Sequence, residues 1–184
     1  MWYAVWVRTG YEDKLMRLCQ SRLMNQNNKD IKDQEITDQQ IIEECFVPRY
    51  ERAWKENGKW GKREEILFPG YLFLVSEHPE ALTKALKEIP EFAKVLGDEE
   101  GPIPLYEQEV AFLQKYTNPD HVLEMSVGVL VGEQLIVTEG PLKYYQGKVV
   151  HVDRHKRMVT LEVEFFGRTV KLKVGLEVIR KVEA

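Results

Sequence analysis

Residues 140–157, with the sequence GPLKYYQGKVVHVDRHKR, hold the densest group of side chains in the chain that could bind a ligand. Seven basic side chains lie here with a single acid, Asp153, and with the aromatic pair Tyr144-Tyr145. Basic side chains neutralise phosphates and aromatic rings stack on unpaired bases, so the pattern favours nucleic-acid binding over a solvated hairpin turn. The residues predicted to bind RNA are Lys143, Lys148, His151, Arg154, His155, Lys156 and Arg157, with Arg168, Lys171 and Lys173 widening the same patch.

A second basic and aromatic stretch covers residues 49–63. Asn57-Gly58 near its centre is a strong tight-turn signal, so we expect a protruding hairpin with one tryptophan on each strand. Two interpretations of Trp54 and Trp60 stay open: they contact nucleic acid, or they pack on each other and cap the hairpin. The candidate DNA contacts are Arg49, Arg52, Trp54, Lys55, Lys59, Trp60, Lys62 and Arg63.

Catalytic and metal-binding patterns are missing from the sequence. It has no glycine-rich phosphate loop and no nucleophile elbow. His151 and His155 are four residues apart, but the alternating pattern around them indicates strand and turn rather than a zinc-binding helix. The acidic pairs Glu43-Glu44, Glu64-Glu65 and Glu99-Glu100 are interpreted as solvated charge. We therefore expect neither an enzyme nor a bound metal or cofactor.

The cysteines and the apolar segments indicate where the protein works. Cys19 and Cys45 stand alone, without the spacing of a zinc site or a redox motif, and are interpreted as small core residues of a reduced, cytoplasmic protein. No apolar run approaches the roughly 20 residues that a helix needs to cross a bilayer. The start, MWYAVWVRTGYE, lacks the basic region and the cleavage site of a signal peptide.

Charge is distributed unevenly along the 184 residues, of which 43% are hydrophobic and 30% charged. Residues 1–126 carry 16 Lys and Arg against 23 Asp and Glu, a net of −7, whereas residues 127–184 carry 10 against 7, a net of +3. This length suffices for one domain or two small ones. The asymmetry favours two modules with different partners.

The first module reads as α+β, with antiparallel strands and helices. Turn signals and hydrophobic periodicity predict strands at 2–7, 41–48, 66–75 and 92–96, and helices at 10–23, from 79 to the stop at Pro90, and at 106–116, where Val110 and Leu113 are expected to be buried. Residues 25–40 are polar and are expected to form an exposed loop.

The second module begins after a break at Thr117-Asn118-Pro119-Asp120 and a short linker. Apolar and polar residues then alternate with period two, as in 159–165 and 170–174, and glycines mark the turns. About 55 residues of this pattern predict a small β-barrel. The predicted domains are 1–117 and 128–184, with 118–127 as the linker.

The segment LFPGYLFL at residues 67–74 raises the question of what covers a sheet that is apolar on both faces. In a strand, Tyr71 and Phe73 point to one face, and Leu72 and Leu74 point to the other. The three predicted helices suffice for one face. A partner covers the second face, or the helices sandwich the sheet on both sides.

Together these features resemble the NusG family of transcription elongation factors. WYAVWVRTGYE is similar to the family's opening strand and helix start, Phe46-Val47-Pro48 falls at its second strand, and LFPGYLFL matches its aromatic-PGY strand. VTEGPLKYYQGKVVHVD resembles a KOW motif, and Phe166-Gly167-Arg168 matches the family's FGR turn. The likeness covers nearly the whole chain apart from residues 25–40.

The resemblance implies an NGN-like domain whose helices cover one face of an antiparallel sheet, followed by a small SH3-like KOW barrel. The other face would dock on the clamp helices of bacterial RNA polymerase through Phe68, Tyr71 and Phe73, with Ile103 and Leu105 as neighbours. The factor, expected as a monomer, would bridge the polymerase cleft and suppress pausing or termination by stabilising one polymerase conformation. Its other implied partners are nascent RNA, including an RNA hairpin, and upstream or non-template DNA.

One departure points to a specialised member. General members usually follow the FGR turn with a Thr-Pro segment, in a region that contacts termination factor Rho and a ribosomal protein; here Arg168 leads directly to Thr169-Val170. With the basic RHKR turn, this resembles the antiterminators of the LoaP type, whose C-terminal domain is associated with RNA recognition. We expect a processive antitermination factor. The alternatives are a general factor whose barrel binds Rho or a ribosomal protein, and a KOW-type RNA-binding protein of the translation apparatus.

Overall fold

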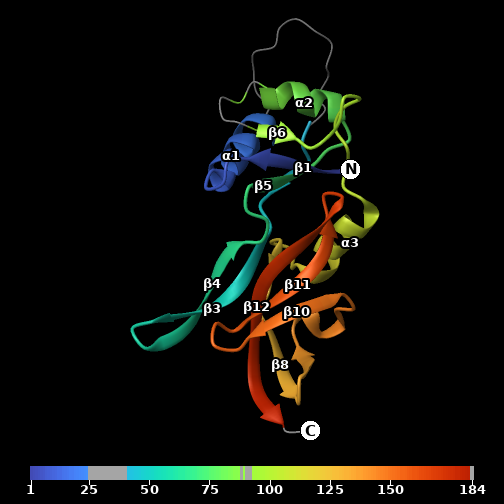
Figure 1. Cartoon of the computed structure of the whole chain (residues 1–184). Helices are drawn as coiled ribbons and strands as arrows, with labels where there is room; N and C mark the ends of the chain where they lie inside the picture. Colours follow the sequence, from blue (N-terminus) through green and yellow to red (C-terminus); the bar gives the residue numbers. More distant parts are fainter. Residues whose placement is uncertain (25–40, 88, 90–92, 183–184) are drawn as a thin grey trace, which may run out of the picture. The chain divides into compact units, whose positions relative to one another are not determined.

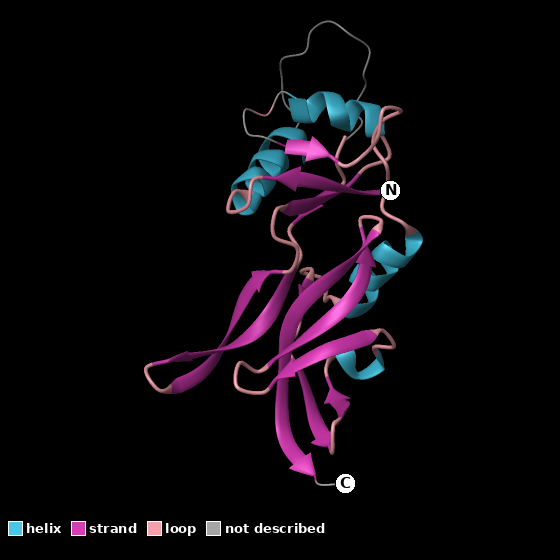
Figure 2. Ribbon diagram, in the orientation of Figure 1, coloured by secondary structure: helices cyan, strands magenta, loops and turns pink. Residues whose placement is uncertain are grey.

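The computed structural model describes residues 1–24, 41–87, 89 and 93–182, and the chain divides into two compact units (Figure 1). The first unit combines Met1–Val47 with Phe68–Tyr106, and the second combines Pro48–Leu67 with Glu107–Ala184. Three predictions fall outside the described residues: the exposed loop at 25–40, the helix stop at Pro90 and the strand start at Phe92. Strands and helices occur in both units, which confirms the α+β class (Figure 2).

The first unit is an antiparallel four-stranded sheet of order β2-β5-β1-β6. Its strands are β1 (Trp2–Val7), β2 (Glu44–Phe46), β5 (Tyr71–Val75) and β6 (Ala93–Val95). Its helices are α1 (Glu12–Cys19), which continues as a π-helical turn, η1 (Gln20–Met24), and α2 (Pro79–Lys87). Leu15 and Cys19 of α1 and Leu82 and Leu86 of α2 are buried, so each helix turns one apolar stripe to the core.

The predicted strand 66–75 is interrupted. One strand ends at Ile66 and the next, β5, begins at Tyr71. Between them, Phe68-Pro69-Gly70-Tyr71 forms a turn closed by the Tyr71 N–H, which donates to the Phe68 carbonyl at 3.1 Å. Gly70 has a φ of 86°, and a Cβ atom there would lie 3.3 Å from Thr9 Oγ1, so glycine suits both its conformation and the space. The predicted strand 41–48 is likewise reduced to the three residues of β2.

The second unit contains a three-stranded sheet of order β4-β3-β7 and a curled five-stranded sheet of order β10-β11-β12-β8-β9. The elements are β3 (Arg49–Glu56), β4 (Lys59–Ile66), α3 (Glu107–Tyr116), β7 (Val122–Leu123), β8 (Ser126–Val131), β9 (Gln134–Glu139), the 3-10 helix η2 (Pro141–Tyr144), β10 (Lys148–Asp153), β11 (Met158–Phe165) and β12 (Arg168–Val182). Buried Val159, Leu161 and Phe165 alternate along β11 with more exposed residues, as the period-two pattern predicts. The curled sheet corresponds to the predicted barrel.

Helix α3 packs against the curled sheet. The Phe112 ring lies 5.6 Å from that of Phe165, edge to face, and Tyr116 contacts Tyr145 at 5.5 Å. Val110 was predicted to be buried with Leu113, but Val110 is half-buried and Glu109 is buried instead. The reason is a hydrogen bond: the Phe166 N–H, in the turn between β11 and β12, donates to Glu109 Oε1 at 2.5 Å.

The hairpin β3–β4 also groups with the C-terminal strands. Residues 118–127, expected as a linker, contain β7, which pairs with β3 in parallel, and the start of β8. Within the described residues, contacts therefore place the hairpin and α3 with the curled sheet, and the domain limits 1–117 and 128–184 stay a prediction. None of the described helices is both long and apolar enough to traverse a bilayer.

Candidate functional site

The sheet of the first unit has two different faces. Residues paired across antiparallel strands share a face, and Phe73 pairs with Ala4 and with Phe46, while Tyr71 pairs with Trp6. We call the side chains on this side, together with the preceding turn residue, the aromatic face: Trp2, Trp6, Phe46, Phe68, Tyr71 and Phe73.

The opposite face is the core side. Leu72 and Leu74 are fully buried there, as expected. Cys45, which pairs with Leu74, directs its Sγ toward the Met16 carbonyl oxygen of α1 at 3.9 Å, so the helix covers this face. Cys19 and Cys45 are both buried, in agreement with their interpretation as core residues.

Exposure differs along the aromatic face and its neighbours. Phe68 and Phe73 are 3% and 0% exposed, and their rings lie 5.7 Å apart. Of the other residues predicted to bind polymerase, Tyr71 and Leu105 are half-buried and Ile103 is 42% exposed. Trp6, 43% exposed and paired with Tyr71, was missed. The alternation of WYAVWV, combined with antiparallel pairing to LFPGYLFL, is the signal that could have found it.

Glu12 holds the Phe-Pro-Gly-Tyr turn in place. Its carboxylate is buried and accepts the Gly70 N–H at 2.7 Å and the Gly10 N–H at 2.6 Å. A buried carboxylate with two charge-assisted hydrogen bonds fixes its donors strongly. Glu12 therefore ties the start of α1 to the turn that precedes Tyr71, and nothing in the local sequence pattern indicates this long-range contact.

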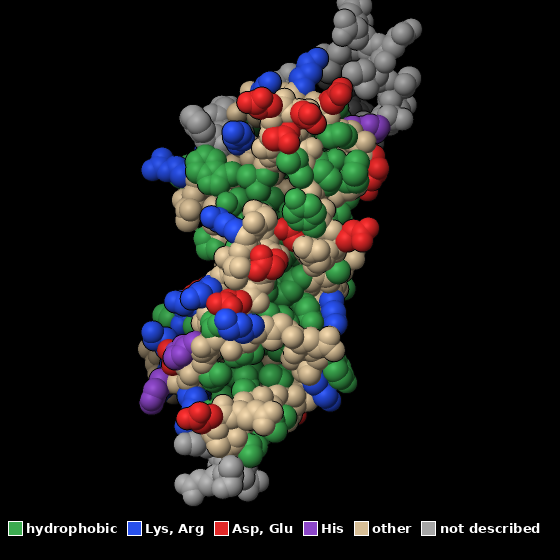
Figure 3. Space-filling model, turned by 45° about the vertical axis from the view of Figure 1, so that its right-hand side comes forward, with side chains coloured by type: hydrophobic (Ala, Val, Ile, Leu, Met, Phe, Trp, Pro, Cys, Tyr) green, Lys and Arg blue, Asp and Glu red, His purple; other side chains and the backbone are tan. Residues whose placement is uncertain are grey.

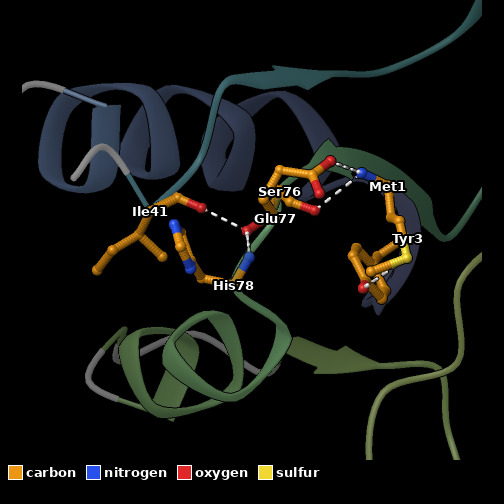
Figure 4. Close-up of polar contacts among 6 residues, drawn as sticks. All are labelled: Met1, Tyr3, Ile41, Ser76, Glu77 and His78. Carbon is orange, nitrogen blue, oxygen red and sulfur yellow. Dashed lines mark hydrogen bonds and ion pairs between the residues drawn. The ribbon is translucent and has the colours of Figure 1, made fainter.

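The far end of β5 is fixed by a small polar network (Figure 4). Ser76 Oγ donates to the Ile41 carbonyl at 2.5 Å and accepts the His78 N–H at 3.0 Å. The Met1 amino group donates to the Ser76 carbonyl at 3.0 Å and to Glu77 at 2.5 Å. The hydrogen bond and the positive charge of that amino group lower the pKa of the exposed Glu77. These bonds fix the register of β5 against β1, and with it the aromatic face.

In the second unit, the hairpin β3–β4 is formed as predicted. Asn57 and Gly58 have φ angles of 50° and 81°, the positive values that a type I′ turn requires at both central residues. Trp54 pairs with Gly61, whereas Trp60 pairs with Lys55, so the two indoles project from opposite faces. The expectation that they pack on each other is therefore wrong.

The Trp54 face of the hairpin is organised by Glu65. Its carboxylate accepts Tyr50 Oη at 2.7 Å and Arg52 Nη1 at 3.2 Å, and it pairs with Arg63. Desolvation raises the pKa of Glu65, but these hydrogen bonds and the Arg52 charge lower it further than burial raises it. Burial and the bond to Glu65 raise the pKa of Tyr50 to about 12. Arg63 also lies 3.5 Å over the Trp54 ring.

The Trp60 face is attached to the curled sheet. Glu51 Oε2 accepts the Met125 N–H at 2.9 Å and Lys62 Nζ at 2.8 Å. A Cβ atom on Gly175 of β12 would lie 2.2 Å from the Glu51 carbonyl oxygen, so the backbones approach closely there. The Arg157 guanidinium, from the β10–β11 turn, lies 3.8 Å from the Trp60 ring centroid and pairs with Glu177 at 3.0 Å.

The residues predicted to bind RNA do not form a single cluster. His151, Arg154, His155 and Arg157 line one open hollow with Asp153 and Glu177. Figure 3 shows histidine and basic side chains gathered on one side of the second unit. Lys148 and Lys171 both pair with Glu162 in the register, and Lys173 pairs with Thr160, so these lysines share the outer face of the sheet.

Three further predicted features lie apart from this hollow. Arg168 pairs with Phe165, at the other end of β11 from Arg157, about 23 Å away at about 3.3 Å per residue, so it lies apart from the hollow and its RNA contact stays a prediction. Lys143 belongs to η2, where Tyr144 is 69% exposed. Tyr145 is engaged with the protein itself: its Oη donates to the Glu162 carbonyl at 2.9 Å, and burial raises its pKa to about 12.

Among the described residues, no three His, Cys, Asp or Glu side chains are placed to hold a metal ion. The two candidate sites differ in character. One is an apolar aromatic sheet face, and the other is a basic surface with exposed indole rings.

Known proteins resemble this chain over almost all of its length. The family described as "Transcription termination factor nusG" matches residues 1–114. A transcription termination/antitermination protein NusG of Helicobacter pylori is 24% identical, covering 98% of each chain. That of Staphylococcus carnosus is 27% identical, covering 98% of this chain and 95% of the relative. A solved structure described as "Domain interaction in Thermotoga maritima NusG" matches with a TM-score of 0.54 at 19% identity, over 95% and 92% of the two chains, which supports the fold.

Proposed function

The chain belongs to the NusG family of transcription termination and antitermination factors, and on that premise we propose that it is a processive antitermination factor. Factors of this family act with RNA polymerase in transcription and are not enzymes. In this proposal the aromatic face of the first unit binds the clamp helices of the polymerase, and the basic surface of the second unit binds nascent RNA. Tighter binding to one polymerase conformation than to others then suppresses pausing and termination.

The observation that carries the proposal is the aromatic face itself. Six aromatic residues from three strands and a turn gather on the sheet face opposite α1. Trp6 on this face is 43% exposed, and Ile103 of the same unit is 42% exposed; exposed apolar surface of this kind marks interaction sites. Phe68 and Phe73 are buried, so the direct contacts are assigned to Trp6, Tyr71 and Ile103.

The specialised role rests on the second unit. Lys148, Lys171 and Lys173 lie on one outer face of the curled sheet, and the turn 154–157 adds further basic groups. Glu109 and Phe112 of α3 contact the Phe165-Phe166 end of β11, so the FGR turn is engaged by the chain's own helix. Both features favour RNA over Rho or a ribosomal protein as the partner, in the manner of the LoaP type.

A second candidate is a general elongation factor whose C-terminal strands bind Rho or a ribosomal protein. It is favoured by the relatives, which are named termination/antitermination proteins and match over nearly the full chain. A pull-down with the full chain, offered Rho and the ribosomal proteins, separates the two: capture of either with no RNA affinity selects the general factor.

The test of the RNA role is a fourfold charge reversal, Lys148→Glu, Arg154→Glu, Lys156→Glu and Arg157→Glu, in the full chain. Loss of several phosphate contacts should weaken RNA binding about 100-fold at moderate salt, measured by fluorescence anisotropy. The matched control reverses four exposed basic residues of the first unit, Arg17, Lys84, Lys87 and Lys94, and should bind RNA nearly as the parent does. Equal affinity of the two variants would refute the RNA role.

The functional readout is transcription in vitro through a terminator, with and without an RNA element upstream. The parent chain should raise read-through, and the fourfold variant should lose the part of this effect that depends on the element. A polymerase-binding variant, Trp6→Ala with Tyr71→Ala, should lose read-through on both templates.

A further inference from the structure

We propose that the β3–β4 hairpin and the β10–β11 turn form one binding surface for an unpaired RNA strand, centred on the stacked pair Trp60 and Arg157. The inference rests on the proposed function, because it adds the hairpin to the RNA-binding surface assigned there. The hairpin had been a candidate for DNA contact only, and the sequence placed about 90 residues between its tryptophan and the basic turn.

The two elements are held together within one compact unit. The Arg157 guanidinium lies 3.8 Å from the centroid of the Trp60 ring, and its Nη1 forms an ion pair with Glu177 Oε1 at 3.0 Å. At the base of the hairpin, Glu51 accepts the Met125 N–H and lies against Gly175. These contacts fix the position of the indole relative to the turn before any ligand arrives, and preorganised groups lose less entropy on binding.

Trp60 keeps a free surface for a base. Its side chain is 47% exposed although Arg157 lies against it and Lys55 approaches to 5.8 Å. Stacking on an indole suits any unpaired base, because every base has a π-face, while paired bases are stacked inside a helix and cannot offer theirs. An exposed indole flanked by cations therefore fits a single strand rather than a duplex.

The charges around Trp60 are available to phosphates. Lys55, Lys59 and Arg154 have no carboxylate partner among the described residues. Arg157 pairs with Glu177 through Nη1 only, so the other N–H groups of its guanidinium can donate to a phosphate. It also lines the open hollow together with His151, Arg154 and His155, so a strand that stacks on Trp60 can continue directly onto the turn.

The Trp54 face of the same hairpin lacks this arrangement. Its two arginines, Arg52 and Arg63, are both paired with Glu65, and Arg63 covers the Trp54 ring at 3.5 Å. Glu65 therefore balances one of the two positive charges and engages both guanidinium groups. The two tryptophans are nearly equal in exposure, 41% and 47%, which makes Trp54 a matched control for Trp60.

The experiment compares Trp60→Ala with Trp54→Ala in the full chain. The probe is a fluorescein-labelled, unstructured RNA of about 16 nucleotides, the upper end of the length that one single-strand-binding module covers. Loss of one base stack should weaken binding about tenfold in Trp60→Ala and less than about twofold in Trp54→Ala. Equal effects of the two substitutions, or a larger effect of Trp54→Ala, would overturn the proposal.

A second variant, Arg157→Lys, keeps the charge but removes the planar guanidinium that stacks on the indole. It should weaken RNA binding about threefold to tenfold while the slope of affinity against salt stays unchanged, because the number of phosphate contacts is conserved. An affinity equal to that of the parent would overturn the role of the stacked pair.

The fourfold charge reversal separates this inference from the function on which it rests. If that variant loses RNA binding and Trp60→Ala does not, the hairpin is not part of the surface, although the RNA role stands. If neither loses binding, both fail. A DNA strand of the same sequence and an RNA duplex serve as further probes: Trp60-dependent binding confined to either of them would overturn the assignment to unpaired RNA.

Discussion

The aromatic face of the first unit and the hairpin–turn surface of the second use the same residue types in opposite ways. In the first, aromatic rings contact one another: Trp2 and Phe46 at 5.3 Å, and Phe46 and Phe73 at 5.7 Å. In the second, each exposed indole contacts a guanidinium, Trp54 with Arg63 and Trp60 with Arg157. Ring-on-ring packing builds an apolar surface that excludes water, whereas rings between cations stay wet and charged. This difference supports the proposal that the first surface binds a protein and the second binds a nucleic acid.

The largest expected effect is the difference between a buried ring and an exposed ring of the aromatic face, Phe73 and Trp6. Phe73→Ala should destabilise the first unit by about 3–5 kcal/mol, because a fully buried ring leaves a cavity among its neighbours. Trp6→Ala removes a ring that is 43% exposed and should change stability by less than about 1 kcal/mol, yet weaken polymerase binding about tenfold. Denaturant unfolding and a polymerase-binding assay measure the two quantities.

Phe68→Ala combined with Tyr71→Ala would be a less discriminating test of docking than Trp6→Ala. Phe68 is only 3% exposed, so its loss would lower stability and binding together and leave the cause ambiguous. Parent-like polymerase affinity in Trp6→Ala, with stability intact, would show that the aromatic face is not the docking surface.

The sequence predicted those parts of the fold that depend on local periodicity. Alternation in 159–165 gave β11 and its buried side, and Asn57-Gly58 gave the hairpin turn. The assignment of Leu72 and Leu74 to the core follows from the same period of two. The interruption at Phe68-Pro69-Gly70 was missed because the apolar run continues through the turn, although Pro-Gly itself is a turn signal.

Contacts between segments distant in the chain could not be predicted in this way. The attachment of Glu12 to Gly70, of Glu109 to the Phe166 N–H, and of Trp60 to Arg157 each joins elements more than 50 residues apart. Composition indicated that residues 140–157 are basic, but only the register showed that Arg168 lies at the other end of β11. The types of side chain predicted the chemistry of the site, whereas the pairing of distant strands determines which residues lie together in it.

The next largest expected effect is the salt dependence of binding, which should differ between the hairpin–turn surface and the aromatic face. If about four basic side chains contact phosphates, raising the salt from about 50 to 200 mM should weaken single-strand RNA binding about 50-fold. The affinity for polymerase through the aromatic face should change only a fewfold over the same salt range, because burial of apolar surface releases no counterions. Paired titrations by fluorescence anisotropy give both slopes. A steep salt dependence of polymerase binding that persists in the fourfold charge variant would contradict the apolar character of the first surface.

The smallest effect concerns Glu65, which pairs with both arginines of the Trp54 face, Arg52 and Arg63. Its pKa is lowered from 4.5, so its carboxylate contributes stability that is fully present above that value and is lost as the pH falls through the lowered pKa. Glu65→Gln should therefore destabilise the hairpin by about 1 kcal/mol or less at neutral pH, since the site is partly solvated, and the difference from the parent should vanish in strong acid. Unfolding followed by tryptophan fluorescence at the two pH values measures this. The substitution also releases Arg52 and Arg63, so if charge alone distinguished the two hairpin faces, Glu65→Gln would make RNA binding sensitive to Trp54→Ala. Continued insensitivity would show that the position of Trp60 beside the turn, rather than free charge, selects its face.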